Sequence, residues 1–261
     1  MSLTFGSAPF APQRGSFDFP VPEHARYWEP WPRRLRAILA GRTLLDTEHA
    51  IVLHETGRLP VHYFSFDDLD PELLTPADPA NDGGRRWDVR VGERIAAAAV
   101  TAYAEPAGAA GGPPLEGFVT IDFGAMDRWF EEDEPIYSHL RDPYHRVDIR
   151  ASSRRVVVRH AGVVVAESSR PKLLFETGTP TRYYLPFIDV DLGVLERSDT
   201  ISECPYKGDG QHWHLTVDGD RVPDAAWSLP HPLPEGIAAA EHPCFYPDKV
   251  HVEVDGQPVT D

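Results

Sequence analysis

The sequence has few cysteines, few lysines and no long apolar run. Its only cysteines are Cys204 and Cys244, which are too few for a disulfide framework and are not spaced as a metal-binding Cys-x-x-Cys pair. No stretch reaches the ~20 apolar residues of a membrane helix, and residues 1–19 lack the basic start and apolar run of a signal peptide. We therefore expect a soluble, cytoplasmic protein with no membrane partner, no metal and no cofactor.

Acidic residues outnumber basic ones, and lysine is scarce. The formal net charge is −16, and the lysines are Lys172, Lys207 and Lys249. Phosphate backbones and anionic lipids repel so acidic a chain, so we expect no nucleic-acid partner, while a small-molecule ligand stays open. The preference for arginine over lysine, with abundant alanine, glycine, proline and aspartate, is typical of a high-GC bacterial genome. The 20 glycines and 26 prolines indicate many turns between short elements.

The sequence repeats itself at an offset of 121 residues. Glu-Thr-Gly recurs at 55–57 and 176–178, and Tyr63 recurs as Tyr184. A five-residue insertion then brings Trp87 into line with Trp213, and the alignment places Val100 opposite Trp227. This repeat predicts a tandem. Its segments are an N-terminal strap 1–32, a first repeat 33–130, a connecting strap 131–150 and a second repeat 151–261.

Most segments of each copy are patterned as strands. β-Branched or aromatic runs are separated by Gly or Asp-Gly turns, which is typical of hairpins. The strands expected in the second copy are residues 156–158, 163–165, 182–185, 212–217 and 251–254. A short helix is expected at 234–240, and a helical or strand-end segment at 126–132. The sequence therefore predicts a mainly β fold of two tandem domains with few short helices.

Several motifs of the chain are similar to those of one known family. They are the strings at 175–178, 183–186, 204–208, 226–228, 129–134 and 141–148. Together they resemble tandem members of the domain of unknown function 427 family, which is loosely labelled nucleotidyltransferase-like. The resemblance implies two β-tent-like domains related to methionine sulfoxide reductase B and the cereblon drug-binding domain, and no established activity. Because both copies lack the zinc-holding cysteines of those relatives, the core alone must hold the fold.

A loop of the second copy carries Cys204 and Lys207, three residues apart. A nearby ammonium favours a thiolate, so Lys207 could activate Cys204 as a nucleophile. Lys207 could instead bind a carboxylate or phosphate, or form a Schiff base. The third interpretation is a plain turn with Cys204 buried and Lys207 solvated. The first copy has no such loop, since residues 75–84 contain neither cysteine nor lysine.

An acidic residue precedes the Thr-Gly turn of each copy. Glu176 could act as a general base, or it could pair with Lys207 or Arg182. Its counterpart Glu55 survives in the first copy, which lacks the lysine, and this favours a structural ion pair or turn-stabilising role.

Aromatic residues of the second copy could form the walls of a ligand pocket. The candidates are Tyr184, Tyr206, Trp213 and Trp227, with core packing as the alternative. Tyr183 would point away from Tyr184 because strand side chains alternate. Trp227 is the best pocket candidate, since the first copy has no tryptophan in its place.

Two histidines, His212 and His214, share one face of the expected strand 212–217 and could form half of a metal site. No third ligand is evident, and solvent-facing histidines are the preferred interpretation. We therefore place no metal site in the chain.

These residues favour a pocket in the second copy that binds a small, anionic metabolite. Cys204, Lys207 and Glu176 are the candidate catalytic residues, and the protein could act as a hydrolase or transferase. A non-catalytic binding module or a protein-interaction scaffold is the alternative. The first copy would then be structural support, and since the tandem imitates a dimer, we expect a monomer.

Overall fold

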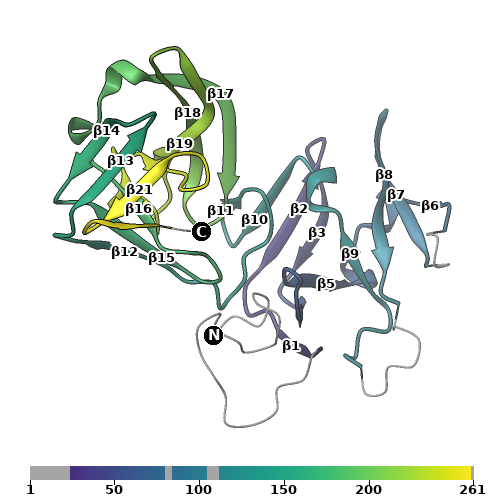
Figure 1. Cartoon of the computed structure of the whole chain (residues 1–261). Coiled ribbons are helices and arrows are strands. Elements are labelled where there is room, and N and C mark those ends of the chain that lie inside the picture. Colours follow the sequence, from purple (N-terminus) through teal and green to yellow (C-terminus); the bar gives the residue numbers. More distant parts are fainter. Residues whose placement is uncertain (1–23, 80–83, 105–111, 260–261) are drawn as a thin grey trace, which may run out of the picture. The chain divides into compact units, whose positions relative to one another are not determined.

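The computed structural model describes residues 24–79, 84–104 and 112–259, and these residues form mainly β-strands (Figure 1). The chain divides into two compact units, unit 1 up to Tyr144 and unit 2 from His145. In each unit the described residues form a seven-stranded and a four-stranded antiparallel sheet. The prediction of a mainly β fold with two tandem domains is confirmed. None of the described residues belongs to a helix that is long and apolar enough to cross a bilayer.

Unit 1 contains the first copy of the repeat. Its large sheet has the order β1 (Arg26–Pro30), β4 (Ile51–Glu55), β5 (Val61–Ser65), β9 (Phe118–Ile121), β8 (Arg94–Ala102), β7 (Arg86–Val91) and β6 (Leu74–Ala77). Its small sheet has the order β11 (Glu134–Ile136), β10 (Arg128–Glu131), β2 (Leu35–Leu39) and β3 (Arg42–Thr47). Buried aliphatic and aromatic side chains from both sheets form one core.

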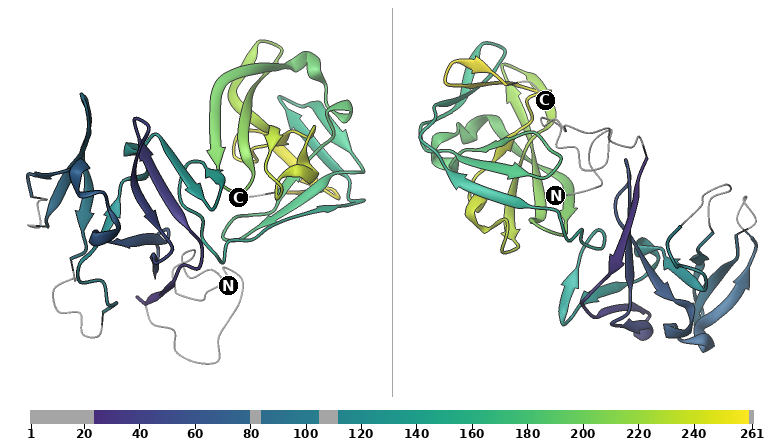
Figure 2. Two further views of the ribbon diagram at one scale, coloured as in Figure 1. Left: turned by 180° about the vertical axis from the view of Figure 1, so that it is seen from behind. Right: turned by 90° about the horizontal axis from the view of Figure 1, so that it is seen from below.

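Unit 2 repeats this topology strand for strand. Its large sheet has the order β12 (Val147–Ala151), β15 (Lys172–Glu176), β16 (Arg182–Tyr184), β20 (Cys244–Phe245), β19 (Asp220–Pro232), β18 (Gly208–Val217) and β17 (Leu195–Cys204). Its small sheet has the order β14 (Val163–Ser168), β13 (Val156–His160), β21 (His251–Val254) and β22 (Gln257–Pro258). Figure 2 shows from two sides how strongly β17, β18 and β19 curve.

The predicted strands of the second copy form, and their turns have the expected chemistry. Gly162, Gly219 and Gly256 all have positive φ at hairpin ends, a conformation that glycine adopts without strain. Inward-facing valines such as Val156 and Val158 are fully buried in the core of unit 2. The alternation of the strands therefore decides which side chains enter the core and which face the opposite side of each sheet.

Helical structure among the described residues is limited to 3-10 turns. These are η1 (Phe66–Asp68), η2 (Pro71–Leu73), η3 (Phe123–Ala125), η4 (Phe187–Asp189), η5 (Leu192–Val194) and η6 (Ile237–Ala239). The helix expected at 234–240 is thus reduced to the single turn η6. The segment 126–132 contains strand β10, because Trp129 pairs with Ala37 and is buried beneath the small sheet.

The two strap segments supply strands of the sheets. Residues 131–150 contain β11, which belongs to unit 1, and β12, which is the first strand of unit 2. Of the N-terminal strap 1–32, residues 1–23 lie outside the described residues, and β1 follows them. Because β1 and β12 occupy equivalent sheet positions, each copy has a strand before the expected repeat starts at 33 and 151.

Strand pairing corrects one alignment of the repeat. Trp87 pairs with Val100 in unit 1, and Trp213 pairs with Ala226 in unit 2. Val100 is therefore equivalent to Ala226, and the counterpart of Trp227 is Thr101, not Val100. The reason is that the hairpin β7–β8 of unit 1 and the hairpin β18–β19 of unit 2 have equal lengths in this region and a register shift at the same place. Neither hairpin therefore has an extra residue here relative to the other.

Candidate functional site

Unit 2 contains a cavity of about 250 Å³ against its large sheet. Six of the residues singled out from the sequence line it, namely Glu176, Arg182, Tyr184, Cys204, Lys207 and Trp227. Glu176 ends β15, Arg182 and Tyr184 lie on β16, and Lys207 lies in the turn between β17 and β18. Tyr184 on β16 and Trp227 on β19 both pair with Cys244, so β20 lies between these two strands and joins them.

An ion pair between Lys207 and Glu176 stands at the wall of the cavity. Lys207 Nζ donates a hydrogen bond to Glu176 Oε2, and His145 Nε2 lies 3.0 Å from Glu176 Oε1. Burial raises the pKa of Glu176, but the hydrogen bonds and charges of His145 and Lys207 outweigh it, so the pKa of this carboxyl is lowered. The side chains of Glu176 and Lys207 are only 8% and 17% exposed. The interpretation of Lys207 as a solvated turn residue is therefore wrong.

Buried packing fixes the position of Lys207. Its carbonyl oxygen accepts a hydrogen bond from Leu233 N at 3.0 Å. A Cβ atom on Gly236 would lie 2.6 Å from that same oxygen, so a larger residue cannot stand there without a shift. Tyr206 is buried and stacks on His145 with ring centroids 4.2 Å apart. Tyr206 therefore packs against His145, which in turn contacts Glu176 of the ion pair, and Tyr206 does not line the cavity.

Aromatic side chains form another wall of the cavity. Trp227 Nε1 donates to the Tyr184 hydroxyl at 3.0 Å, and burial raises the pKa of Tyr184 well above its ordinary value. Tyr246 contacts Trp227 with ring centroids 4.3 Å apart, and Arg182 lies over the Trp227 ring at 5.9 Å. This wall consists of an indole, the phenol of Tyr246 and a guanidinium, with the fully buried Tyr184 packed against them.

Trp213 lies elsewhere. It packs at the edge of the core, where its indole donates to Ser228 Oγ at 2.9 Å and contacts Phe187. It faces a second cavity of about 550 Å³, which Phe187 and Ser228 also line. Tyr183 likewise packs on the core, away from Tyr184, as strand alternation predicts.

Among the residues near the cavity that were not singled out are His145, Ser202 and Tyr246. The sequence contains one signal for His145. His24 stands 121 residues before it, and His24 Nε2 lies 3.8 Å from Glu55 Oε1. Ser202 and Tyr246 carry no such signal, because the position of Ser202 depends on the register of the hairpin β17–β18 and that of Tyr246 on the pairing of β20 with β16 and β19.

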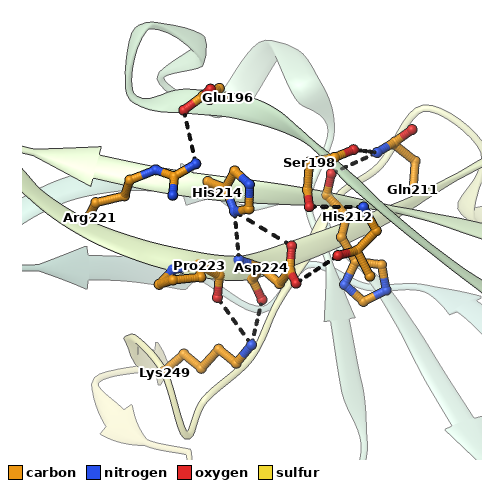
Figure 3. Close-up of polar contacts among 10 residues, drawn as sticks. Glu196, Ser198, Gln211, His212, His214, Arg221, Pro223, Asp224 and Lys249 are labelled. Atoms are coloured by element: carbon orange, nitrogen blue, oxygen red, sulfur yellow. Dashed lines mark hydrogen bonds and ion pairs between the residues drawn. The ribbon is translucent and has the colours of Figure 1, made fainter.

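His212 was expected to face solvent, and it is buried instead. Its Nε2 lies 3.0 Å from Ser202 Oγ, and its ring stacks on Tyr246. Figure 3 shows the neighbouring polar network, in which His214 Nδ1 accepts from Asp224 N at 3.0 Å and Lys249 Nζ donates to the Asp224 carbonyl at 2.9 Å. Among the described residues no group of three or more histidine, cysteine, aspartate or glutamate side chains is arranged to hold a metal ion.

Unit 1 lacks most of these groups. Tyr63 keeps the place of Tyr184 and contacts Tyr103, but Val61 and Thr101 stand where unit 2 has Arg182 and Trp227. Part of the equivalent of the lysine loop, residues 80–83, lies outside the described residues. The lysine–glutamate pair beside Arg182 and Trp227 is thus a property of the second copy, although unit 1 has a cavity of about 310 Å³ at another place, lined by Arg85, Trp87 and Tyr103.

Fold and cavity together define a duplicated β protein whose second copy carries the cavity described above. The sequence matches the family described as Domain of unknown function (DUF427) twice, over residues 27–132 and 148–256. The chain belongs to this family. No curated protein matches the chain. The family description states no activity.

Proposed function

We propose that the second copy binds a small molecule that carries a carboxylate or phosphate group on a planar body. Lys207 and Arg182 would contact the anionic group, and Trp227 and Tyr246 would contact the planar body, while the buried Tyr184 would position Trp227 through its hydroxyl. One observation carries the proposal: one of the three lysines and an arginine of a chain with net charge −16 line the same cavity as three aromatic side chains.

The ion pair also fits a binding role. Glu176 uses one carboxylate oxygen for His145 and the other for Lys207, so it is occupied in holding the lysine. An ammonium has three N–H donors, and Glu176 accepts one of them. Glu176 would therefore position Lys207 to bind an anion. Glu176 would not contact the anion itself, because the two negative charges would repel each other. We propose further that the bound molecule is processed there by a hydrolase or transferase reaction.

Calorimetric titration with benzoate and phenyl phosphate, and with neutral benzamide, tests this function. We expect the anionic probes to bind and benzamide to bind at least about tenfold more weakly, because a charged hydrogen bond is worth roughly 1.5–3 kcal/mol. Arg182→Met and Trp227→Leu should each weaken binding of the anionic probes by a similar factor. Lys172→Met, which removes a lysine that does not line the cavity, should leave binding unchanged. Equal affinity for all three probes, or no binding, would contradict the proposal.

A further inference from the structure

A hydroxyl and an imidazole form a close pair at the edge of the same cavity. Ser202 Oγ lies 3.0 Å from His212 Nε2, whereas the other acceptor within reach, Gly210 O, lies 3.5 Å away. Ser202 is exposed and lines the cavity, and His212 is buried behind it. We propose that Ser202 is a nucleophile and His212 its general base, in acyl transfer from a small anionic ester. This inference rests on the proposed function, since the ester would occupy the same cavity.

The strands that carry the pair give it a fixed geometry. Ser202 on β17 pairs with Gly210 on β18, and a Cβ atom at residue 210 would lie 2.5 Å from Ser202 Oγ. A glycine is therefore needed for the hydroxyl to occupy this position. His212 pairs with Trp227, and its ring stacks on Tyr246 at 6.2 Å between centroids. The base is thus held by strand pairing on one side and by an aromatic ring on the other.

The surroundings of His212 suit a general base. Burial lowers the pKa of His212, the nearby Lys249 lowers it further, and Asp224 opposes them, so the net pKa stays below its ordinary value. The imidazole is therefore neutral at pH 7. With the proton on Nδ1, Nε2 can accept the Ser202 proton.

Asp224 supplies a charge for the imidazolium that would form. Its carboxylate accepts a hydrogen bond from Thr200 Oγ1 at 3.0 Å, and its pKa is lowered by hydrogen bonds from Ser198 and Thr200 and by His212 and His214. Among the described residues, Asp224 makes no hydrogen bond to His212. The buried Nδ1 of His212 has no hydrogen-bond partner among them. Asp224 would therefore act through its charge, and it is a positioning and stabilising group rather than a catalytic residue.

The pair is specific to the second copy. In the alignment that strand pairing supports, Arg86 stands in the place of His212 and Ala98 in the place of Asp224. Ala98 and Asp224 both have positive φ, at 49° and 48°, and in each copy a side chain of the facing strand accepts a hydrogen bond from the backbone N–H. The backbone conformation and its hydrogen bond are thus common to both copies, whereas the imidazole of His212 and the carboxylate of Asp224 occur only in unit 2.

The reaction balances without a further reactant except water. Ser202 Oγ forms a bond to the carbonyl carbon of the ester while its proton passes to His212 Nε2. The bond from that carbon to the alcohol oxygen breaks, and the alcohol leaves with the proton from Nε2. Water then attacks the acyl-serine by the same route, giving a carboxylic acid and free Ser202. Lys207 and Arg182 would hold an anionic group elsewhere on the ester.

Labelling of the full chain with a fluorophosphonate, followed by peptide mass spectrometry, tests the proposal together with p-nitrophenyl acetate hydrolysis. We expect the label on Ser202, and a hydrolysis rate that falls at least about a hundredfold in Ser202→Ala and His212→Gln. The rate should reach its plateau by pH 7, with a midpoint below the ordinary value for histidine of about 6.5. Ser228→Ala, a serine of the same sheet that does not line this cavity, should leave label and rate unchanged.

Label on Cys204, or an unchanged rate in Ser202→Ala, would overturn the inference. Ser202→Ala changes only an exposed side chain, so it keeps the test decisive even where His212→Gln disturbs packing. Benzoate titration of the native protein separates the two proposals. If the native protein binds benzoate but is not labelled, the acyl-transfer inference alone is wrong. If the native protein does not bind benzoate, the proposed function is wrong.

Discussion

Replacing Lys207 by methionine is expected to lower the free energy of unfolding of unit 2 by about 3 kcal/mol at pH 8, as measured by urea denaturation. The variant leaves Glu176 as a carboxylate with an 8% exposed side chain and only His145 as a partner. The desolvation of this charge, which Lys207 now offsets, then acts unopposed. Breaking a buried ion pair costs more than the pair contributes, because the remaining charge stays buried.

The loss of stability in this variant is expected to depend on pH, because it depends on the charge of Glu176. In the native protein the pKa of Glu176 is lowered, so its contribution to stability is present above the pKa of the unfolded state and is lost as pH falls. Without Lys207, burial raises the pKa of Glu176, so the carboxyl takes up a proton more readily and the cost of the substitution should shrink at pH 4.5.

Two controls complete the Lys207 experiment. The double variant Glu176→Gln with Lys207→Met should recover most of the lost stability, because it removes the buried charge as well. Lys172→Met should have an effect within about 0.5 kcal/mol, as expected for a lysine outside such a pair. A destabilisation that is equal in the single and the double variant would show that the ion pair does not carry the effect.

Sequence periodicity and internal repetition predicted the fold well because both signals are local. Strand alternation placed Tyr184 and Tyr183 on opposite sides, and the repeat indicated that Trp227 and Lys207 belong to one copy only. Pairing across the sheet was not available from these signals. It brings Ser202 next to His212, and it moves the counterpart of Trp227 from Val100 to Thr101.

The candidate site shows the same division between local and non-local information. Glu176, Arg182 and Lys207 could be selected from the sequence alone, because all three are charged and lysines are few in this chain. His145 lies in the segment that was expected to be a connecting strap, and its role depends on a contact with Glu176, 31 residues away. Trp213 was expected in the pocket because of its residue type, but its strand position directs it to the other side of the sheet.

Unit 1 carries a second feature with a large expected effect, a pair of buried histidines. His54 and His62 are 0% and 4% exposed, and none of their ring nitrogens has a hydrogen-bond partner among the described residues. Trp31 contacts the His62 ring edge-on at 4.8 Å. Burial, together with the neighbouring His54 and His139, lowers the pKa of His62 to about 3. Unit 2 has no histidines here, since Phe175 and Tyr183 are the counterparts.

We therefore expect the native protein to lose about 2 kcal/mol of unfolding free energy between pH 8 and pH 5 through His62 alone. The folded-state pKa lies below the unfolded value of about 6.5, so the unfolded chain takes up the proton first as pH falls. The contribution of His62 is thus fully present above pH 6.5 and is lost progressively toward pH 3. Urea denaturation at a series of pH values measures this slope.

His62→Phe should remove this part of the slope, because phenylalanine keeps an aromatic ring in the core and cannot take up a proton. At pH 8 the variant should be as stable as the native protein or slightly more stable, since it buries no polar atom without a partner. His49→Gln, at an exposed position, should leave the native slope unchanged. Parallel stability curves for the native protein and His62→Phe would show that unit 1 accommodates a charged His62, and that another group sets its sensitivity to acid.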